Sequence, residues 1–178
     1  ADAVGGGVSK EKVAYEPRGV DVHAIFGKAV LSHDEIDRIG SNAKSVLEMN
    51  ESDSSCVSIT LSHAYGIGTA VGSTLMSGGT VVLPAVGGIR GCGVPEQRAE
   101  VTLDVLSSEG CSVLFADSHT LKALPEPGNK DVTKFRTGVV KIASGTDFLE
   151  GVTSAASKGE EFELAFAGKQ LWAYGKKK

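Results

Sequence analysis

The chain has 178 residues and a mass of 18.4 kDa, the size of one domain that can bury a hydrophobic core. Hydrophobic residues make up 41% of it, the net charge is -4 and the pI is near 5.6. This acidic balance argues against a nucleic-acid partner, because neutralising phosphates requires a basic surface. No apolar run has the roughly 18 to 20 residues of a transmembrane helix, so we expect no membrane span.

The composition divides the chain into three parts. Residues 1–19 contain a Gly-Gly-Gly run and Pro17 without apolar periodicity, and we expect an extended N-terminal arm. Residues 20–175 carry the periodic segments and are predicted to form one α/β domain. Residues 176–178 are three lysines, which we expect to form a basic, solvated tail.

The first periodic segments predict a hairpin followed by a helix. Residues 21–31 are rich in β-branched residues around a Gly-Lys turn, which is typical of a β-hairpin. Ser32 and Glu35 have the spacing of a capping box, in which each side chain bonds the other residue's backbone. The apolar periodicity that follows predicts an amphipathic helix to about Met49.

Strands and helices then alternate. A nearly continuous apolar strand at 56–61 precedes a His-aromatic-Gly turn and a helix of small residues that Gly78 and Gly79 close. Pro95 suits a helix's first position, and Gly110 suits the end of that helix. Further strands are expected at 81–83, 112–116, 137–143, 163–167 and 171–174, and further helices at 96–108, 118–124 and 148–157. The pattern predicts a layered α/β domain with a largely parallel sheet flanked by helices.

Several of these segments also resemble the N-terminal domain of the adenylate-forming superfamily, the acyl-CoA synthetases and AMP-binding ligases. The family's "K-G-V-V-L-S-H", "P-L-F-H-x-x-G", "G-G/A-T-V-V-L", "V-T-V-L-x-x-V-P-T-x-L-x-x-L" and "L-R-x-x-x-x-G-G" motifs occur in that order. Their counterparts are residues 28–33, 61–66, 78–84, 111–124 and 134–145. The resemblance implies a fragment of that domain.

The motifs that carry the family's chemistry are degenerate. Residues 19–28 replace its Ser/Thr/Gly-rich phosphate loop, and they have lost most hydroxyls and glycines while gaining Asp21, which would repel phosphate. Residues 174–178 replace its "Y-G-x-T-E" turn with lysines, which cannot bind Mg²⁺. We therefore predict no catalytic residues, no metal site and no cofactor.

One remnant of a site is predicted at the His-aromatic-Gly turn. In the family this turn lies along the acyl channel, so the resemblance implies a residual acyl pocket at His63, Tyr65 and Gly66, against the alternative of a histidine satisfied at the sheet's edge. The glycines at 66, 68 and 72 do not have the spacing of a dinucleotide-binding loop, and small residues that allow close packing explain them better. The four histidines are scattered without metal-binding spacing.

The cysteines are expected to act as small apolar residues in a reducing compartment. Cys56 and Cys111 fall inside predicted strands, and together with Cys92 they form an odd set without C-x-x-C spacing. The chain starts at Ala1, which is compatible with a removed targeting peptide.

The leading hypothesis is a non-catalytic structural subunit of a larger assembly, derived from an acyl-CoA synthetase. We expect other protein subunits as partners, with a mitochondrial complex such as the respiratory chain or ATP synthase as the host. Two alternatives remain: an acyl- or CoA-binding module without catalysis, and one part of a split adenylate-forming enzyme.

Overall fold

The computed structural model describes residues 23–26, 29–62, 65–84, 94–141 and 165–166. The predicted N-terminal arm and basic tail lie outside these residues. So do His63, Cys92, the helix expected at 148–157 and the strand expected at 171–174.

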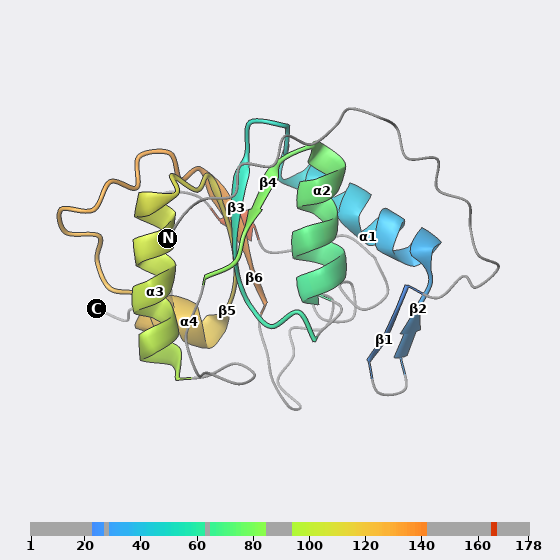
Figure 1. Ribbon diagram of the computed structural model, residues 1–178, viewed down its shortest axis with the longest axis horizontal. Coiled ribbons are helices and arrows are strands. Elements are labelled where there is room, and N and C mark those ends of the chain that lie inside the picture. Colours follow the sequence, from blue (N-terminus) through green and yellow to red (C-terminus); the bar gives the residue numbers. More distant parts are fainter. Residues whose placement is uncertain (1–22, 27–28, 63–64, 85–93, 142–164, 167–178) are drawn as a thin grey trace, which may run out of the picture.

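A five-stranded sheet in the order β4-β3-β5-β6-β7 forms the centre of the molecule (Figure 1). Its strands are β3 (Ser54–Ser58), β4 (Thr80–Val82), β5 (Val113–Asp117), β6 (Thr137–Lys141) and β7 (Ala165–Phe166). The first four in this spatial order run parallel, and β7 pairs antiparallel with β6. The largely parallel sheet predicted from the sequence is confirmed.

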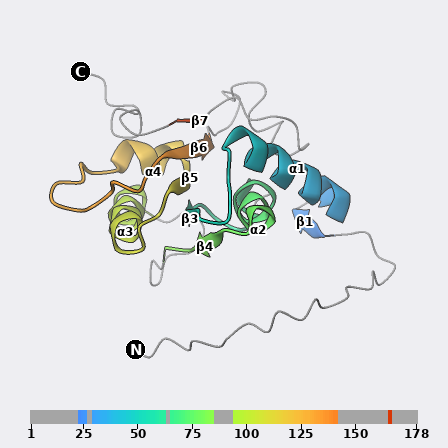
Figure 2. The ribbon, with the colours of Figure 1, turned by 90° about the horizontal axis from the view of Figure 1, so that it is seen from above.

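Helices cover both faces of this sheet, which gives a three-layer α/β domain. They are α1 (His33–Val46), the π-helical segment η1 (Tyr65–Gly72), α2 (Ser73–Ser77), α3 (Pro95–Ser108) and α4 (Ser118–Ala123). Figures 1 and 2 show α1 and α2 on one side of the sheet and α3 and α4 on the other. The connection from β4 through α3 to β5 crosses over β3. The order in which successive strands are added to the sheet therefore reverses between β3 and β5.

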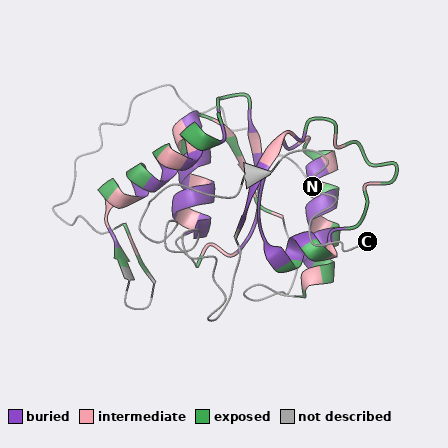
Figure 3. Cartoon of the chain, turned by 180° about the vertical axis from the view of Figure 1, so that it is seen from behind, coloured by how far each residue is buried: buried purple, intermediate pink, exposed green. Residues whose placement is uncertain are grey.

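The core consists of two apolar layers that share the sheet. In β5, Val113 and Phe115 belong to the layer under α1 and η1, whereas Leu114 and Ala116 belong to the layer under α3 and α4. Every residue of β5 is buried, as the purple strands of Figure 3 show. A strand covered on both faces needs apolar residues at successive positions, which explains its continuous hydrophobic run.

The structure confirms several predictions that rest on local sequence signals. The antiparallel strands β1 (Ala24–Phe26) and β2 (Ala29–Leu31) make the hairpin. At the start of α1, the Glu35 amide donates to Ser32 Oγ at 3.2 Å and the Ser32 amide donates to Glu35 Oε2 at 2.8 Å, so the capping box is complete. Its hydrogen bonds lower the pKa of Glu35. Pro95 is the first residue of α3.

The predicted end of α1 is wrong by one turn. The helix ends at Val46 because Glu48 has a φ of +50°, in the left-handed region. The Glu48 and Met49 amides donate to the Ser45 and Lys44 carbonyls at 3.2 and 2.9 Å, which is the hydrogen-bond pattern of a Schellman motif. Glycine normally marks this motif, so a glutamate at the position gives no warning in the sequence.

Two further boundaries differ from the prediction. The first strand of the sheet spans Ser54–Ser58 rather than 56–61, and the small-residue helix begins as the π-helical η1 before α2. Gly78, with a φ of +78°, ends α2 as expected.

The prediction that Cys111 lies in a strand is also wrong. It lies in the short link between α3 and β5, whereas Cys56 lies in β3 as expected. Both are buried free thiols. A hydrogen bond between them raises the pKa of Cys56, with burial adding to the effect, and lowers the pKa of Cys111.

An arginine and an aspartate join the amino ends of β3 and β6. Arg136 donates from Nε to Asp53 Oδ1 at 2.9 Å and from Nη2 to Asp53 Oδ2 at 2.6 Å, and its Nη1 donates to the Leu47 carbonyl at 2.8 Å. Asp53 also accepts from Ser112 Oγ at 2.7 Å and from the Asn50 amide at 2.9 Å. Burial opposes ionisation of Asp53, but these hydrogen bonds outweigh it and lower its pKa.

No helix in the described part of the chain has both the length and the apolar character needed to cross a bilayer.

Candidate functional site at the carboxyl edge of the sheet

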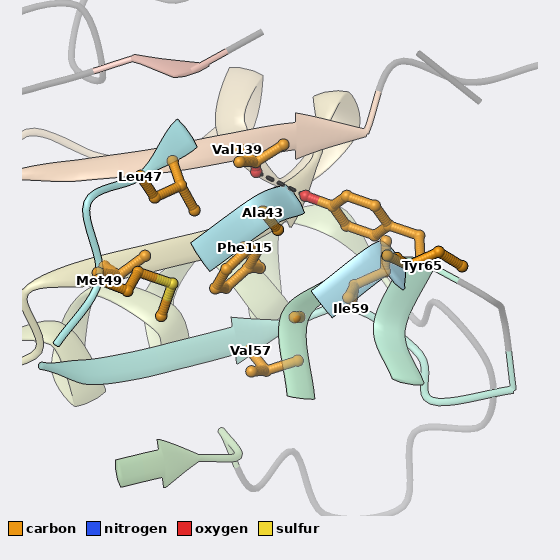
Figure 4. Close-up of a cluster of buried hydrophobic side chains, with 11 residues drawn as sticks. Ala43, Leu47, Met49, Val57, Ile59, Tyr65, Phe115 and Val139 are labelled. Atoms are coloured by element: carbon orange, nitrogen blue, oxygen red, sulfur yellow. Dashed lines mark hydrogen bonds between the residues drawn. The ribbon is translucent and has the colours of Figure 1, made fainter. Parts of the chain in front are cut away.

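The structure describes two of the three residues expected to form a residual acyl pocket. Tyr65 begins η1 and has no exposed surface. Its hydroxyl donates to the Val139 carbonyl at 2.8 Å, and its ring packs edge-on against Phe115 with centroids 6.4 Å apart (Figure 4). Burial raises the pKa of Tyr65 well above its usual range, and the charge of Asp117 raises it further. Tyr65 is therefore part of the hydrophobic core, with its hydroxyl engaged.

Gly66 is held against the chain that leads into the turn. A Cβ at this position would lie 2.3 Å from the Thr60 carbonyl oxygen, closer than any real contact. The glycine thus allows η1 to begin directly beside the segment that follows β3. This explains the glycine by close packing, without reference to a ligand.

A second group of polar residues lies where β3 and β5 end. Arg98 of α3 pairs with Asp117, the last residue of β5, with Nη2 and Oδ2 2.9 Å apart. Their side chains are only 8% and 7% exposed. Asp117 also caps α4, because its Oδ1 accepts from the Thr120 amide at 2.7 Å.

The same edge is tied to β3 through hydroxyl groups. Ser58 is the last residue of β3, and its Oγ lies 2.5 Å from Thr102 Oγ1. Thr102 Oγ1 also lies 2.6 Å from the Arg98 carbonyl, to which it can donate. Hydrogen bonds from both strand ends thus hold the first half of α3 in place.

This group contains donors and acceptors that the described part of the fold leaves unused. Arg98 Nε and Nη1 and Thr120 Oγ1 are buried and have no hydrogen-bond partner among the described residues. Thr69 Oγ1 is also buried without a partner among the described residues, but it lies in η1, which packs against α1. Buried polar atoms are nearly always paired, because leaving one unpaired costs about 1–3 kcal/mol. Several such atoms beside one ion pair make this edge the strongest candidate for a binding site.

Sequence reasoning missed Arg98, although a weak signal for it was present. Arg98 and Thr102 are four residues apart, and each directly precedes an apolar residue, Ala99 or Leu103. Both therefore lie on the face of the helix that is otherwise apolar. Polar residues on a buried face need partners, and this requirement was the available clue. Asp117 before the helix at 118–124 was also readable as a cap.

The structure brings together two histidines that the sequence separates. His23 and His33 have Nδ1 atoms 3.3 Å apart and rings in an edge-on arrangement. The spacing of the histidines along the chain gave no sign of this pair. In the described residues no group of three or more histidine, cysteine, aspartate or glutamate side chains is placed to hold a metal ion.

Comparison with known proteins gives a structural likeness but no sequence match. No family model and no curated protein matches the chain. Its structure is similar to the crystal structure of the anthranilate CoA ligase AuaEII in complex with anthranoyl-AMP, with a TM-score of 0.52 and 15% identity. The fold is that of part of an adenylate-forming CoA ligase.

The chain resembles only a part of the ligase. It covers 75% of this chain and 25% of the ligase, so the chain spans about a quarter of the ligase's length. At this identity the adenylate-forming CoA ligase likeness concerns the fold alone. It confirms the resemblance seen in the sequence motifs and the α/β class.

Proposed function

We propose that this chain is a non-catalytic α/β subunit of a larger protein assembly, built on part of the adenylate-forming CoA ligase fold. The observation that carries the proposal is the outer edge of β4. Among the described residues β4 pairs with β3 alone, which leaves its other edge available for a partner strand.

Exposed apolar side chains lie on the elements next to this edge. Leu83 directly follows β4 and is 52% exposed, and Leu75 of α2, which contacts β4, is 64% exposed. Large apolar side chains beside an unpaired strand edge favour contact with another protein. The degenerate phosphate-loop and Mg²⁺ motifs at residues 19–28 and 174–178 support a role without catalysis.

The proposed partners are other subunits of a mitochondrial complex, such as the respiratory chain or ATP synthase. Cys56 and Cys111 are free thiols, which suits a compartment that keeps cysteines reduced.

The assembly is tested by native electrophoresis of the endogenous protein followed by mass spectrometry. We expect migration with other subunits, and migration as a monomer near 18 kDa would refute the proposal. Leu75→Lys should weaken the association. Ile25→Lys is the matched control, because Ile25 on the β1–β2 hairpin is also 64% exposed and lies away from β4.

The absence of catalysis is tested separately by isothermal titration of ATP with Mg²⁺. We expect no heat of binding and no pyrophosphate release with carboxylic acids. Micromolar binding of ATP would contradict the non-catalytic role while leaving the assembly open to the first experiment.

A further inference from the structure

We propose that the carboxyl edge between β3 and β5 is an oxyanion-binding site, in which Arg98 and the N-terminus of α3 hold a phosphate or carboxylate group of a small molecule. The site goes beyond the proposed role as a subunit and does not depend on it. It consists of Arg98, the first turn of α3, and Thr120 of α4.

The first argument is the state of the Arg98 guanidinium. One nitrogen, Nη2, is engaged by Asp117 at 2.9 Å, while Nε and Nη1 have no partner among the described residues and the whole residue is 7% exposed. Nε carries one N–H and Nη1 carries two, so three donors remain unused. Guanidinium donors arranged in a plane match the oxygens of carboxylates and phosphates.

The second argument is the uncapped start of α3. Within the described part of the chain, Val94 occupies the capping position without any side-chain hydrogen bond, and the helix is 14 residues long. The first N–H groups of a helix have no partner within it and carry a partial positive charge, which favours an anion. Helical side chains lean toward the N-terminus, so Arg98 in the fourth helical position extends over this first turn.

The third argument is the place of these groups in the fold. In open α/β sheets, ligands bind beyond the carboxyl ends of the strands where the direction of winding reverses. Here the reversal lies between β3 and β5, and Asp117 is the last residue of β5.

Glu96 places an exposed negative charge in the first turn of α3, and Asp117 places a buried one beside Arg98. The Asp117 carboxylate neutralises much of the Arg98 charge and is itself held by the Thr120 amide at 2.7 Å. The attraction for an anion therefore comes from the helix terminus and from the unused N–H groups rather than from a free positive charge. Thr120 is the second residue in contact with the Asp117 carboxylate, and its Oγ1, buried and unpartnered in the described residues, offers one more donor.

The test is a titration of the full chain, labelled with ¹⁵N, with inorganic phosphate and separately with acetate. Sodium chloride at matched ionic strength is the control. We expect saturable shifts of the Arg98 Nε–H and Thr120 amide resonances with one or both oxyanions and none with chloride. The arm that saturates at the lower concentration identifies phosphate or carboxylate as the preferred group. Absence of a saturable shift with both oxyanions would overturn the proposal.

Variants then identify the groups that bind. Arg98→Lys keeps the charge but removes the guanidinium donors and should weaken binding about tenfold, as expected for a charge-assisted hydrogen bond. Thr120→Val should weaken it about fivefold, and Thr120→Ser should restore it because the hydroxyl returns. Lys122→Gln, which removes an exposed charge on the same helix, is the control and should leave the affinity unchanged.

Two results would contradict this assignment. Equal affinity of Arg98→Lys and the original chain would exclude the guanidinium, and a loss with Lys122→Gln as large as with Arg98→Lys would indicate a nonspecific surface effect. If Arg98→Lys fails to fold, the wild-type Nε–H resonance and the Thr120→Val and Thr120→Ser pair decide the question.

Discussion

The sheet carries an arginine–aspartate pair at each end, and the two pairs use their hydrogen-bonding groups very differently. At the amino end, Arg136 donates from all three nitrogens and Asp53 accepts from Ser112 and Asn50 besides the arginine. At the carboxyl end, Arg98 uses one nitrogen on Asp117 and leaves two unpaired in the described part of the chain. The first pair has the completeness of a structural clamp, and the second retains capacity to bind something else.

The largest effect is expected from breaking the amino-end clamp. Asp53→Ala removes the acceptor of Arg136, Ser112 and the Asn50 amide together and should cost about 4 kcal/mol of unfolding free energy, because each of these partners loses a hydrogen bond to a charged group. The measurement is urea unfolding followed by circular dichroism. Asp104→Ala is the control: it breaks the exposed pair with Lys130 and should cost at most about 1 kcal/mol. Similar losses in the two variants would show that the clamp is no more than a surface pair.

At the carboxyl end, the double variant of Arg98 and Asp117 should be more stable than the single Arg98 variant. Arg98→Met alone leaves the Asp117 carboxylate buried without its cation and should cost about 3 kcal/mol. Adding Asp117→Asn keeps a capping side chain for α4 and should recover most of that loss. The same urea series on the single and double variants gives the coupling between the two residues.

The amino end should not show this recovery. Arg136→Met with Asp53→Asn still loses one of the two bonds that Asp53 accepts from Ser112 and Asn50, because an amide has a single acceptor oxygen, and it loses the Leu47 contact of Arg136. A recovery of equal size at both ends would contradict the contrast between the pairs.

Acidification should lower the stability of the original chain more than that of a variant without the Asp53 carboxylate. The folded-state pKa of Asp53 lies below its ordinary value of 3.8, so its stabilisation is present above that value and is lost as the pH falls through the lower folded pKa. The difference in urea midpoint between the original chain and Asp53→Asn should therefore shrink on acidification below pH 3.8. Glu35, whose pKa is also lowered, remains in both proteins, so its contribution cancels. A constant difference across this pH range would argue against the ionised clamp.

The smallest effect is expected for the unused hydroxyl. Thr120→Val removes a buried oxygen that has no partner among the described residues, so no hydrogen bond is lost and the variant should be no less stable than the original chain. Thr102→Val makes the same chemical change where the hydroxyl contacts Ser58 and the Arg98 carbonyl, and it should cost about 1–2 kcal/mol. Urea unfolding of the two variants side by side measures the contrast. A larger loss at Thr120 would mean that its hydroxyl is already engaged in the folded chain.

Much of the fold could be predicted because its signals are local. The capping box at Ser32, Pro95 at the start of α3 and Gly78 at the end of α2 act through their nearest neighbours along the chain. Continuous apolar runs indicated strands covered on both faces. The end of α1 was missed because Glu48 takes a left-handed conformation that its residue type does not signal.

The candidate site was less predictable than the fold. The sequence drew attention to Tyr65 and Gly66 through a resemblance, and the structure places Tyr65 in the core with its hydroxyl on Val139. Arg98 and Asp117 drew no attention as a pair, because 19 positions separate them and no motif contains both.

The sequence by itself determined the α/β class, most element positions and the likeness to the acyl-CoA synthetase fold, since these depend on periodicity and on neighbours along the chain. Only the tertiary structure decided which polar residues meet. Asp53 finds Arg136 because β3 and β6 begin at the same edge of the sheet, on either side of β5. Arg98 finds Asp117 because α3 starts at the edge of the sheet where β5 ends. Hydrogen bonds act over about 3 Å, and separation along the chain says little about such distances.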